Sequence, residues 1–336
     1  MTAEREQHLQ AFLKMAGWAD AQRIVLAGDA SNRRYDRLRH PDLGKAVLMD
    51  APPEKGEDTR SFINIATHLR QAGLSAPEIF ARDTTNGFLI IEDLGDDLFA
   101  RVLEKNPGPE LQLYLAATDA LYTAQQAEPP ANLLPYGPKE MADTALLAAD
   151  WYLTYAVENP PDIREEFRLR IADLLHRTLT GPPVLVQRDY HAENLLWLPD
   201  RDGDRRVGLL DFQDAMMGDA AYDLASLLKD ARRDVDPSVQ HQCIEHFIRV
   251  SQSDKQQFGA RYAVCSAQRN LRIIGVFTRL CVRDGKGHYP DMLPRVWRNL
   301  MDDLTHPDLA EFGQWVRQVL PAPTPDIVAR IKAANA

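Results

Sequence analysis

The sequence predicts an α+β protein with two lobes: a small β-rich N-terminal lobe over residues 1–94 and a larger helical lobe over residues 95–336. Strand patterns are concentrated in the first ninety residues, whereas from Leu98 onward apolar residues recur mostly at helical spacing. The length of 336 residues also exceeds the roughly 150 residues of an average domain. A polar segment, residues 93–97, separates the two patterns, and a cleft between lobes is a common ligand site.

The N-terminal lobe combines two helices with five strands. An opening helix is predicted from apolar residues at helical spacing before Gly17, and a second helix over residues 58–71. Strands are predicted at residues 23–27, 34–39, 45–50, 78–82 and 87–92. The last of them is a continuous apolar run, as a strand at the centre of a sheet requires.

The second lobe is mostly helical and carries a small β insert. Helices are predicted at residues 111–126, 138–157, 164–179, 222–231, 238–250 and 255–283. Short strands are predicted at residues 184–187, 195–198 and 207–210. The motifs with chemical character lie on the loops of this β insert.

Composition limits the classes of function. The chain has 39 Lys and Arg against 49 Asp and Glu, a formal net charge of −10, which argues against a nucleic-acid surface but leaves room for a nucleotide ligand. Cys243, Cys265 and Cys281 are too few and too widely spaced for a disulfide framework. No apolar run is long enough to span a membrane, and the N-terminus lacks a signal-peptide core. We therefore expect a cytoplasmic protein with no membrane partner; its oligomeric state is left open.

The most informative segment is the loop RDYHAEN at residues 188–194, which lies between two apolar strands. Asp189 precedes Asn194 by five residues, and a second segment, LLDFQD, places Asp211 after the following strand. Phosphoryl transfer needs a carboxylate that receives the proton of the acceptor hydroxyl, and an amide and a second carboxylate that hold Mg²⁺. We assign the first role to Asp189 and the metal-binding roles to Asn194 and Asp211.

These two loops resemble the catalytic and metal-binding loops of the aminoglycoside phosphotransferase/choline kinase family, whose members are related to protein kinases. Gln187 and Arg188 stand where the family usually has His and Gly. The string GDAAYDLASL further along matches another family element, and the resemblance implies that its Asp223 supports the catalytic loop. It also implies a protein-kinase-like fold and the use of ATP and Mg²⁺.

The same resemblance assigns nucleotide contacts in the N-terminal lobe. The string IEDLG occupies the hinge position, where the carbonyl of Glu92 and the amide of Leu94 would pair with the edge of adenine. The loop expected to cover the phosphates carries the candidate residues Ser31, Asn32, Arg33 and Arg34. Met49 stands where the third strand of such kinases offers a lysine. Either Lys45 takes that role or one arginine of the 33–34 pair does, and the planar guanidinium favours an arginine.

Several further strings, including GDASNRRYDRL, AVLMDAPPE and QRNLRIIGVFTRL, resemble the bacterial anomeric sugar kinases that act on N-acetylmuramate and N-acetylglucosamine. This resemblance implies phosphorylation of a C1 hydroxyl in cell-wall sugar recycling. Candidate substrate residues are His191, Glu193, Arg269 and Asn270, although packing or an internal ion pair would explain them equally well. A carboxylate on muramate would need a cation, which Arg269, Arg272 or Arg279 could supply.

Two alternatives remain at this stage. One is a kinase of the same fold that acts on an aminoglycoside, choline, homoserine or a ketosamine. The other is a pseudokinase that binds a nucleotide and regulates a partner. The retained metal-binding residues Asn194 and Asp211 argue against the second alternative, because pseudokinases commonly lose such residues.

Overall fold

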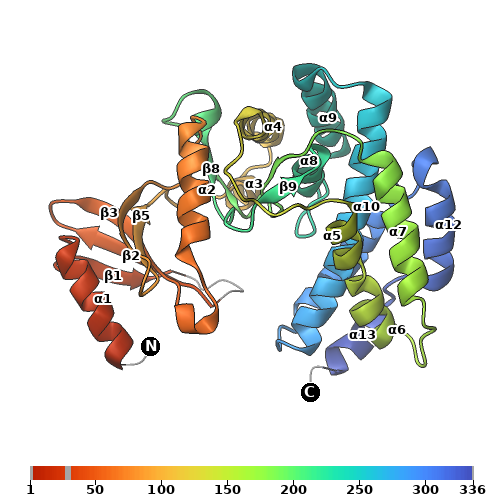
Figure 1. The fold of residues 1–336 in the computed structure, drawn as a ribbon, viewed down its shortest axis with the longest axis horizontal. Helices are drawn as coiled ribbons and strands as arrows, with labels where there is room; N and C mark the ends of the chain where they lie inside the picture. The colour runs from red at the N-terminus through yellow and green to blue at the C-terminus, as the bar shows by residue number, and fades with distance from the viewer. Residues whose placement is uncertain (1–2, 27–31, 335–336) are drawn as a thin grey trace. The chain divides into compact units, whose positions relative to one another are not determined.

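In the computed structural model, which describes residues 3–26 and 32–334, the chain divides into two units (Figure 1). The first, here called the N-terminal unit, combines Met1–Asn106 with Glu193–Ala215. The second, here called the helical unit, combines Pro107–Ala192 with Met216–Ala336. The mixed α+β class is confirmed, but each unit is built from two stretches of chain.

A five-stranded antiparallel sheet with strand order β1-β2-β3-β5-β4 forms the centre of the N-terminal unit. The elements of this unit are α1 (Ala3–Met15), β1 (Gln22–Val25), β2 (Arg34–His40), β3 (Gly44–Asp50), η1 (Pro53–Lys55), α2 (Thr59–Gln71), β4 (Ile79–Asp83), β5 (Phe88–Glu92), α3 (Phe99–Lys105), β7 (Leu195–Trp197), η3 (Gly203–Arg206) and β8 (Val207–Leu209). All five predicted strands are present within two residues of their expected limits. Helix α3 was not predicted.

Helix α1 packs against one face of the sheet. Side chains alternate between the two faces of a strand, so Leu38, Leu48 and Ile90 share one face and form a core with Leu9 and Phe12 of the helix. The helix is also held by charge: Arg5 Nε donates to Asp50 Oδ1 at 2.9 Å. The opposite face of the sheet is left for α2 and for a cavity.

The segment 193–215 returns to the N-terminal unit as the β7–β8 hairpin, which lies beside α2 (Figure 1). Ser75 ties it in place: its Oγ donates to Arg205 O at 2.7 Å, and its carbonyl accepts from Leu209 N at 2.9 Å. The rings of Phe62 and Phe212 lie 5.0 Å apart between their centroids. The predicted boundary between residues 94 and 95 had left this hairpin in the helical lobe, because hydrogen bonds across a hundred residues leave no trace in local pattern.

The helical unit consists of α4 (Glu110–Gln126), α5 (Pro138–Ala145), the π-helical segment η2 (Ala148–Leu153), α6 (Thr154–Ala156), α7 (Arg164–Thr178), β6 (Val184–Val186), β9 (Met216–Gly218), α8 (Ala221–Leu228), α9 (Pro237–Ser251), α10 (Lys255–Val282), η4 (Tyr289–Met292), α11 (Leu293–Asp303), η5 (Pro307–Leu309), α12 (Ala310–Val319) and α13 (Pro325–Ala333). Strand β9, which pairs with β6, was not predicted.

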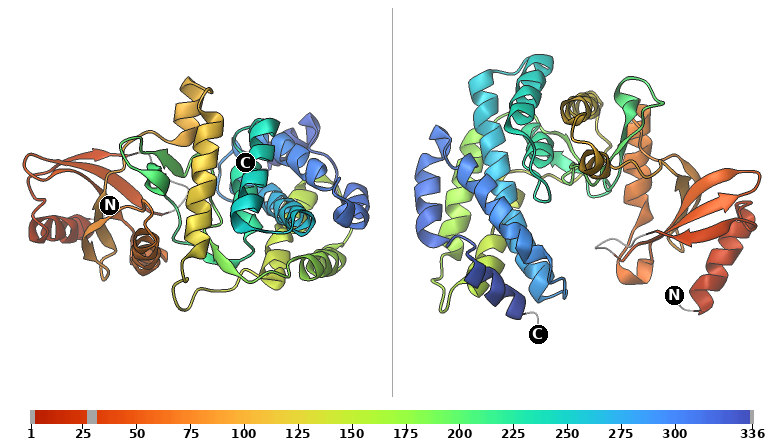
Figure 2. Two further views of the ribbon diagram at one scale, coloured as in Figure 1. Left: turned by 90° about the horizontal axis from the view of Figure 1, so that it is seen from above. Right: turned by 180° about the vertical axis from the view of Figure 1, so that it is seen from behind.

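Helix α10 is the central element of this unit. Its 28 residues span about 42 Å and contact α5, α7, α8, α11 and α13 (Figure 2). A side chain at Gly275 would meet the backbone of Leu147, so the glycine lets the chain pass close to α10. The helix predicted over residues 138–157 is interrupted at this level by the π-helical segment.

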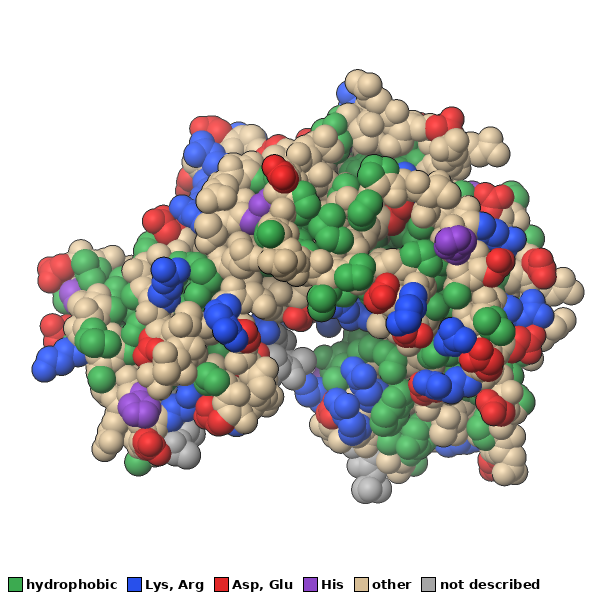
Figure 3. Space-filling model, in the orientation of Figure 1, with side chains coloured by type: hydrophobic (Ala, Val, Ile, Leu, Met, Phe, Trp, Pro, Cys, Tyr) green, Lys and Arg blue, Asp and Glu red, His purple; other side chains and the backbone are tan. Residues whose placement is uncertain are grey.

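No helix among residues 3–26 and 32–334 combines the length and the apolar character needed to cross a membrane. Cys243, Cys265 and Cys281 are buried and form no disulfide. On the face seen in Figure 3, Lys and Arg side chains are interspersed with Asp and Glu side chains.

A buried carboxylate links α10 to α11. Asp303 Oδ2 accepts from Ser266 Oγ at 2.7 Å and from Asn270 Nδ2 at 2.9 Å. Burial raises the pKa of Asp303 to about 7, although Lys229 and these two hydrogen bonds act in the opposite direction. A carboxyl group with a raised pKa in the folded state stabilises the protein below its unfolded pKa of about 4, and this contribution is lost as the pH rises towards 7.

We therefore expect the free energy of unfolding to fall between about pH 4 and pH 7, by up to about 1.4 kcal/mol per pH unit from Asp303. Asp303→Asn cannot ionise and should remove this part of the slope. Asp223, whose pKa is also raised to about 7, adds a slope of the same sign, and His191, whose pKa is lowered to about 4, adds one of the opposite sign. Both remain in the variant, so the difference between the two proteins is the contribution of Asp303. Urea unfolding at pH 5, 6, 7 and 8 measures how the free energy of unfolding changes with pH in each protein. An unchanged slope in the variant would show that Asp303 does not titrate in this range.

Candidate active site

A cavity of about 330 Å³ lies within the N-terminal unit, a volume in the range of small-molecule sites. Its apolar walls come from two parts of the chain: Val47, Met49 and Ile91 of the sheet, and Leu196 and Leu210 of the returning segment. Two apolar surfaces of this kind suit a flat aromatic ring. The cavity therefore offers a place for a nucleobase.

One edge of the cavity is the predicted hinge, with Glu92, Asp93, Leu94 and Gly95 all lining it. The side chain of Glu92 fixes this edge. Its Oε1 accepts from Arg201 Nη2, and its Oε2 accepts from Glu78 N at 3.2 Å. The structure thus gives the Glu92 carboxylate a positioning role in addition to the backbone role predicted from the sequence.

The polar end of the cavity contains Asn194, Asp211 and Gln213. Gln213 Nε2 donates to Asp211 Oδ1 at 2.6 Å, and Asn194 O accepts from Leu210 N at 3.0 Å. Asp211 has a φ of 56°, a left-handed conformation that costs a non-glycine residue free energy and therefore needs support from its surroundings. The structure thus brings the two predicted metal-binding residues together.

An amide oxygen and a carboxylate are hard oxygen donors that fit Mg²⁺. Among the described residues, no group of three or more His, Cys, Asp and Glu side chains could hold a metal ion. Two protein donors are nevertheless enough for Mg²⁺, which keeps several water ligands and takes others from substrate phosphates. The site fits a metal that arrives with a nucleotide.

Asn32 and Arg33 meet the carboxylate of Glu57 at the start of β2. Asn32 N donates to Oε1 at 3.2 Å, and Arg33 Nε donates to Oε2 at 2.7 Å. Arg34 is exposed and pairs in register with Asp50. Ser31, also predicted to contact the nucleotide, lies outside the described residues. Of the two candidate arginines, Arg33 is the one held in a fixed position by a partner.

The register of β2 and β3 shows where Met49 and Lys45 lie relative to the cavity. Met49 pairs with Tyr35, is buried, and lines the cavity. Lys45 pairs with Arg39 at the other end of the strand, about 13 Å away at 3.3 Å per residue. This distance argues against Lys45 as a replacement and leaves Arg33 as the better candidate.

Arg37 is a cavity residue that sequence reasoning missed. Its Nε lies 2.7 Å from Asp93 Oδ2, and its Nη2 lies 2.8 Å from Asp96 Oδ1. Tyr35 and Arg37 alternate along β2 and therefore face the same side, a pattern that could have identified both. The guanidinium holds the hinge segment to β2.

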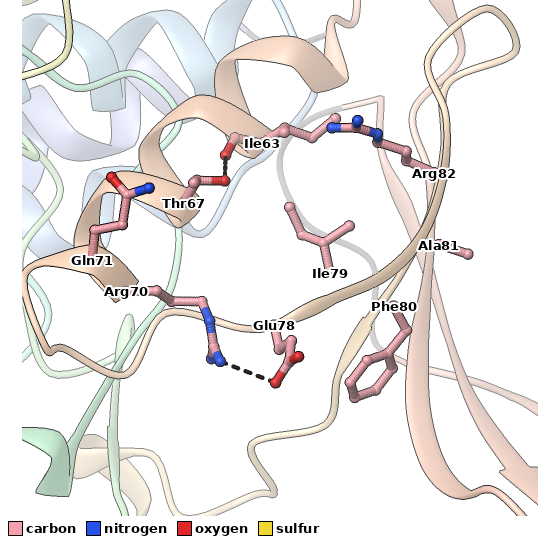
Figure 4. Close-up of a pocket in the computed structure, with 9 residues that line it drawn as sticks. All are labelled: Ile63, Thr67, Arg70, Gln71, Glu78, Ile79, Phe80, Ala81 and Arg82. Carbon is pink, nitrogen blue, oxygen red and sulfur yellow. Dashed lines mark hydrogen bonds and ion pairs between the residues drawn. The ribbon is translucent and has the colours of Figure 1, made fainter.

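A second cavity of the N-terminal unit, about 490 Å³, lies between α2 and β4 (Figure 4). Arg70 Nη2 and Glu78 Oε2 form an ion pair across it at 3.0 Å, and Thr67 Oγ1 donates to Ile63 O at 2.7 Å. Arg70, Glu78 and Thr67 thus already have partners within the unit. None of the predicted site residues lines it, so the first cavity remains the candidate for chemistry.

Residues 187–192 of the candidate catalytic loop belong to the helical unit, and Asp223 binds the backbone at their start. This buried carboxylate accepts from Gln187 N at 2.6 Å and from Arg188 N at 2.8 Å. The predicted support of the loop by Asp223 is confirmed. Arg188 has a φ of 73°, and its guanidinium lies 5.0 Å from the centroid of the Tyr136 ring. The residues that replace the family's His and Gly are thus fixed by backbone bonds and by a cation–π contact.

Asp189 is surrounded by positive charge. Burial acts to raise its pKa, but Arg272 and Arg269, together with Arg188, outweigh burial and lower the pKa below its ordinary value. The carboxylate is therefore ionised at neutral pH and able to accept a proton. Burial lowers the pKa of His191 to about 4, so the imidazole is neutral, and its Nε2 lies 3.4 Å from Arg232 Nη1.

The remaining substrate candidates occupy different environments. Arg269 is buried beside Asp189 and His191, whereas Glu193 is exposed and belongs to the N-terminal unit. The amide of Asn270 binds Asp303 and lies 3.4 Å from Ser266 Oγ within the helical core. This arrangement favours the packing role for Asn270 over substrate contact, because its donors are directed into the protein.

The model of the phosphotransferase enzyme family matches residues 23–254 of the chain. The chain belongs to this family.

Individual relatives agree with this assignment. The phosphotransferase is 35% identical to an N-acetylmuramate/N-acetylglucosamine kinase of Caulobacter vibrioides, with 96% of this chain and 99% of the relative covered. A kinase of the same name from Pseudomonas aeruginosa is also 35% identical, with 89% of each chain covered. The solved choline/ethanolamine kinase family protein from Mesorhizobium loti shares the fold, with a TM-score of 0.62 at 15% identity over 98% of both chains. The predicted kinase-like fold is confirmed.

Support of the loop by Asp223 can be tested in this phosphotransferase. Asp223→Ala removes the acceptor of two backbone N–H groups and should lower kcat by about 100-fold, because small displacements of a reacting group have effects of this size. Nucleotide affinity should change less than about threefold, since the cavity lies in the other unit. Asp223→Asn keeps one acceptor oxygen and should give an intermediate rate. Steady-state kinetics and nucleotide titration measure both quantities; an equal loss in both would contradict the assignment.

Proposed function

We propose that this phosphotransferase uses ATP to phosphorylate the anomeric C1 hydroxyl of N-acetylmuramate and N-acetylglucosamine. The observation that carries the proposal is the similarity, over nearly the full length of both chains, to kinases named for these two sugars. Weaker matches at 30% and 28% identity carry the same name. The reaction would salvage sugars released from the cell wall, and we place it in the cytoplasm, where ATP is available.

In this proposal, the cavity of the N-terminal unit takes ATP. The adenine ring lies between the apolar walls, and its edge pairs with the backbone of Glu92 and Leu94. Arg33 contributes positive charge to the phosphates, and Asn194 and Asp211 hold Mg²⁺ when it is bound. The metal neutralises the charge of the phosphate oxygens.

Asp189 is the proposed general base. Its carboxylate is ionised at neutral pH and accepts the proton of the C1 hydroxyl as that oxygen attacks the γ-phosphorus, whose bond to the β–γ bridging oxygen breaks to release ADP. The arginines that lower its pKa also limit its strength as a base. Orientation of the hydroxyl is therefore as much a part of its role as proton transfer, as in kinases generally.

Release of ADP in the presence of a panel of acceptors tests the proposal. We expect turnover with N-acetylmuramate or N-acetylglucosamine and none with choline, homoserine or kanamycin. Turnover with one of the other compounds instead would identify a different kinase of the same fold. Nucleotide binding without turnover on any acceptor would indicate a pseudokinase.

Asp189→Asn should lower kcat by about 10²- to 10⁴-fold while ATP affinity stays within about twofold.

The arginine that serves the phosphates gives a separate prediction. Arg33→Gln should lower kcat/KM for ATP by about 10- to 100-fold, the usual range for loss of a hydrogen bond to a charged group. Arg33→Lys should retain part of the activity, since it keeps the charge but loses the planar fork. Arg39→Gln, an exposed change at the far end of β2, is the matched control. A larger loss in Arg34→Gln than in Arg33→Gln would reverse the assignment.

A further inference from the structure

Arg269 has an unusual environment for an arginine. Its side chain is buried, with only 3% of the residue exposed, and its Nε and Nη1 have no hydrogen-bond partner among the described residues. Buried polar groups are nearly always paired, and an unpaired charged group is costly to keep out of water. The two unpaired nitrogens of Arg269 are therefore candidates for contact with a ligand.

The surroundings of Arg269 are positively charged. Arg272 lies one turn further along α10, on the same side of the helix, and is hydrogen-bonded to Tyr222. The hydroxyl of Tyr222 lies 3.4 Å from that of Tyr136. The ring of Tyr136 in turn makes a cation–π contact with the guanidinium of Arg188. Arginines therefore approach Asp189 from two directions, along α10 and from the catalytic loop itself.

Three carboxylates, those of Asp189, Asp223 and Asp230, lie near these arginines. Asp230 Oδ1 accepts from Arg232 N at 2.8 Å, and its Oδ2 is buried without a hydrogen-bond partner among the described residues. The Asp223 carboxylate is bound to the catalytic loop. His191 is neutral and contributes no charge. The cluster of Arg188, Arg269 and Arg272 thus suits a bound anion.

We propose that Arg269, assisted by Arg272, binds the lactyl carboxylate of N-acetylmuramate and favours this sugar over N-acetylglucosamine, which lacks the group. This inference rests on the proposed function. A guanidinium N–H donates a strong hydrogen bond to a carboxylate, and two nitrogens of Arg269, Nε and Nη1 on different sides of the group, are buried without a partner among the described residues. The specificity residue and the catalytic base then belong to the same unit.

A phosphate is the other anion to consider. Arg33, assigned to the nucleotide phosphates, and Asn194 and Asp211, assigned to their Mg²⁺, all belong to the N-terminal unit. Arg269 and Arg272 belong instead to the unit that carries Asp189, the group that receives the acceptor's proton. The acceptor's own carboxylate is therefore the better match, and phosphate binding becomes an outcome of the test.

The test compares kcat/KM for the two sugars in the full-length protein. Assays at pH 8 keep Asp189 ionised even where loss of an arginine raises its pKa. Arg269→Gln should lower kcat/KM for N-acetylmuramate about 10- to 100-fold more than it lowers the value for N-acetylglucosamine. For N-acetylmuramate only, kcat/KM of Arg269→Lys should lie between the values of Arg269→Gln and the unmodified protein. Arg283→Gln removes the same charge from the exposed end of α10 and is the matched control.

A second substrate separates charge from shape. The amide of N-acetylmuramate keeps the bulk of the lactyl group but not its charge, so the unmodified protein should prefer the acid and Arg269→Gln should not. Equal losses with both sugars in a variant of unchanged melting temperature would overturn the inference and indicate phosphate binding or a structural role. If the unmodified protein phosphorylates neither sugar, the proposed function fails. If it phosphorylates both and Arg269→Gln keeps its preference, only the specificity assignment fails.

Discussion

The carboxylate of Asp223 makes two hydrogen bonds to the backbone N–H groups of Gln187 and Arg188, and the catalytic loop depends on them. They hold Arg188 at a φ of 73°, a conformation that a non-glycine residue adopts only where its surroundings enforce it. Asp189 is the next residue in the chain, so the same two bonds also fix the point from which its side chain starts. Backbone recognition also explains how the loop tolerates Gln and Arg where other members of the family have His and Gly: Asp223 binds no side chain there.

Charge is distributed unevenly in this acidic protein. The net charge of −10 describes the chain as a whole, yet Asp189 lies among arginines of the helical unit that lower its pKa. In the N-terminal unit, by contrast, Arg33 and Arg37 are each paired with a carboxylate. These ion pairs hold the hinge segment and fix Arg33 at the start of β2, whereas Nε and Nη1 of Arg269 have no partner among the described residues.

Much of this arrangement could be predicted from local sequence. The five strands of the sheet, the helix before β4 and the long helix α10 follow from apolar periodicity, which local chain geometry imposes. The loop motif around Asp189 and Asn194, and the later Asp211, predicted candidates for the groups that phosphoryl transfer needs. Periodicity failed for the helix predicted over residues 138–157, where the close approach of Leu147 to Gly275 accompanies a π-helical segment. It also assigned residues 193–215 to the wrong unit, because their partners, such as Ser75, lie far away in the chain.

By itself, the sequence determined the family, the fold class and the residue types available for chemistry, because these follow from short motifs and from local pattern. Only the tertiary structure decided how those residues are used. Strand register brought Arg37 to the cavity and kept Lys45 away from it. Adjacent residues of α10 were separated in role: Asn270 binds Asp303 in the core, whereas Arg269 lies beside Asp189. The physical reason is that successive residues of a helix point about 100° apart, so their partners are set by neighbouring elements and not by their position in the chain.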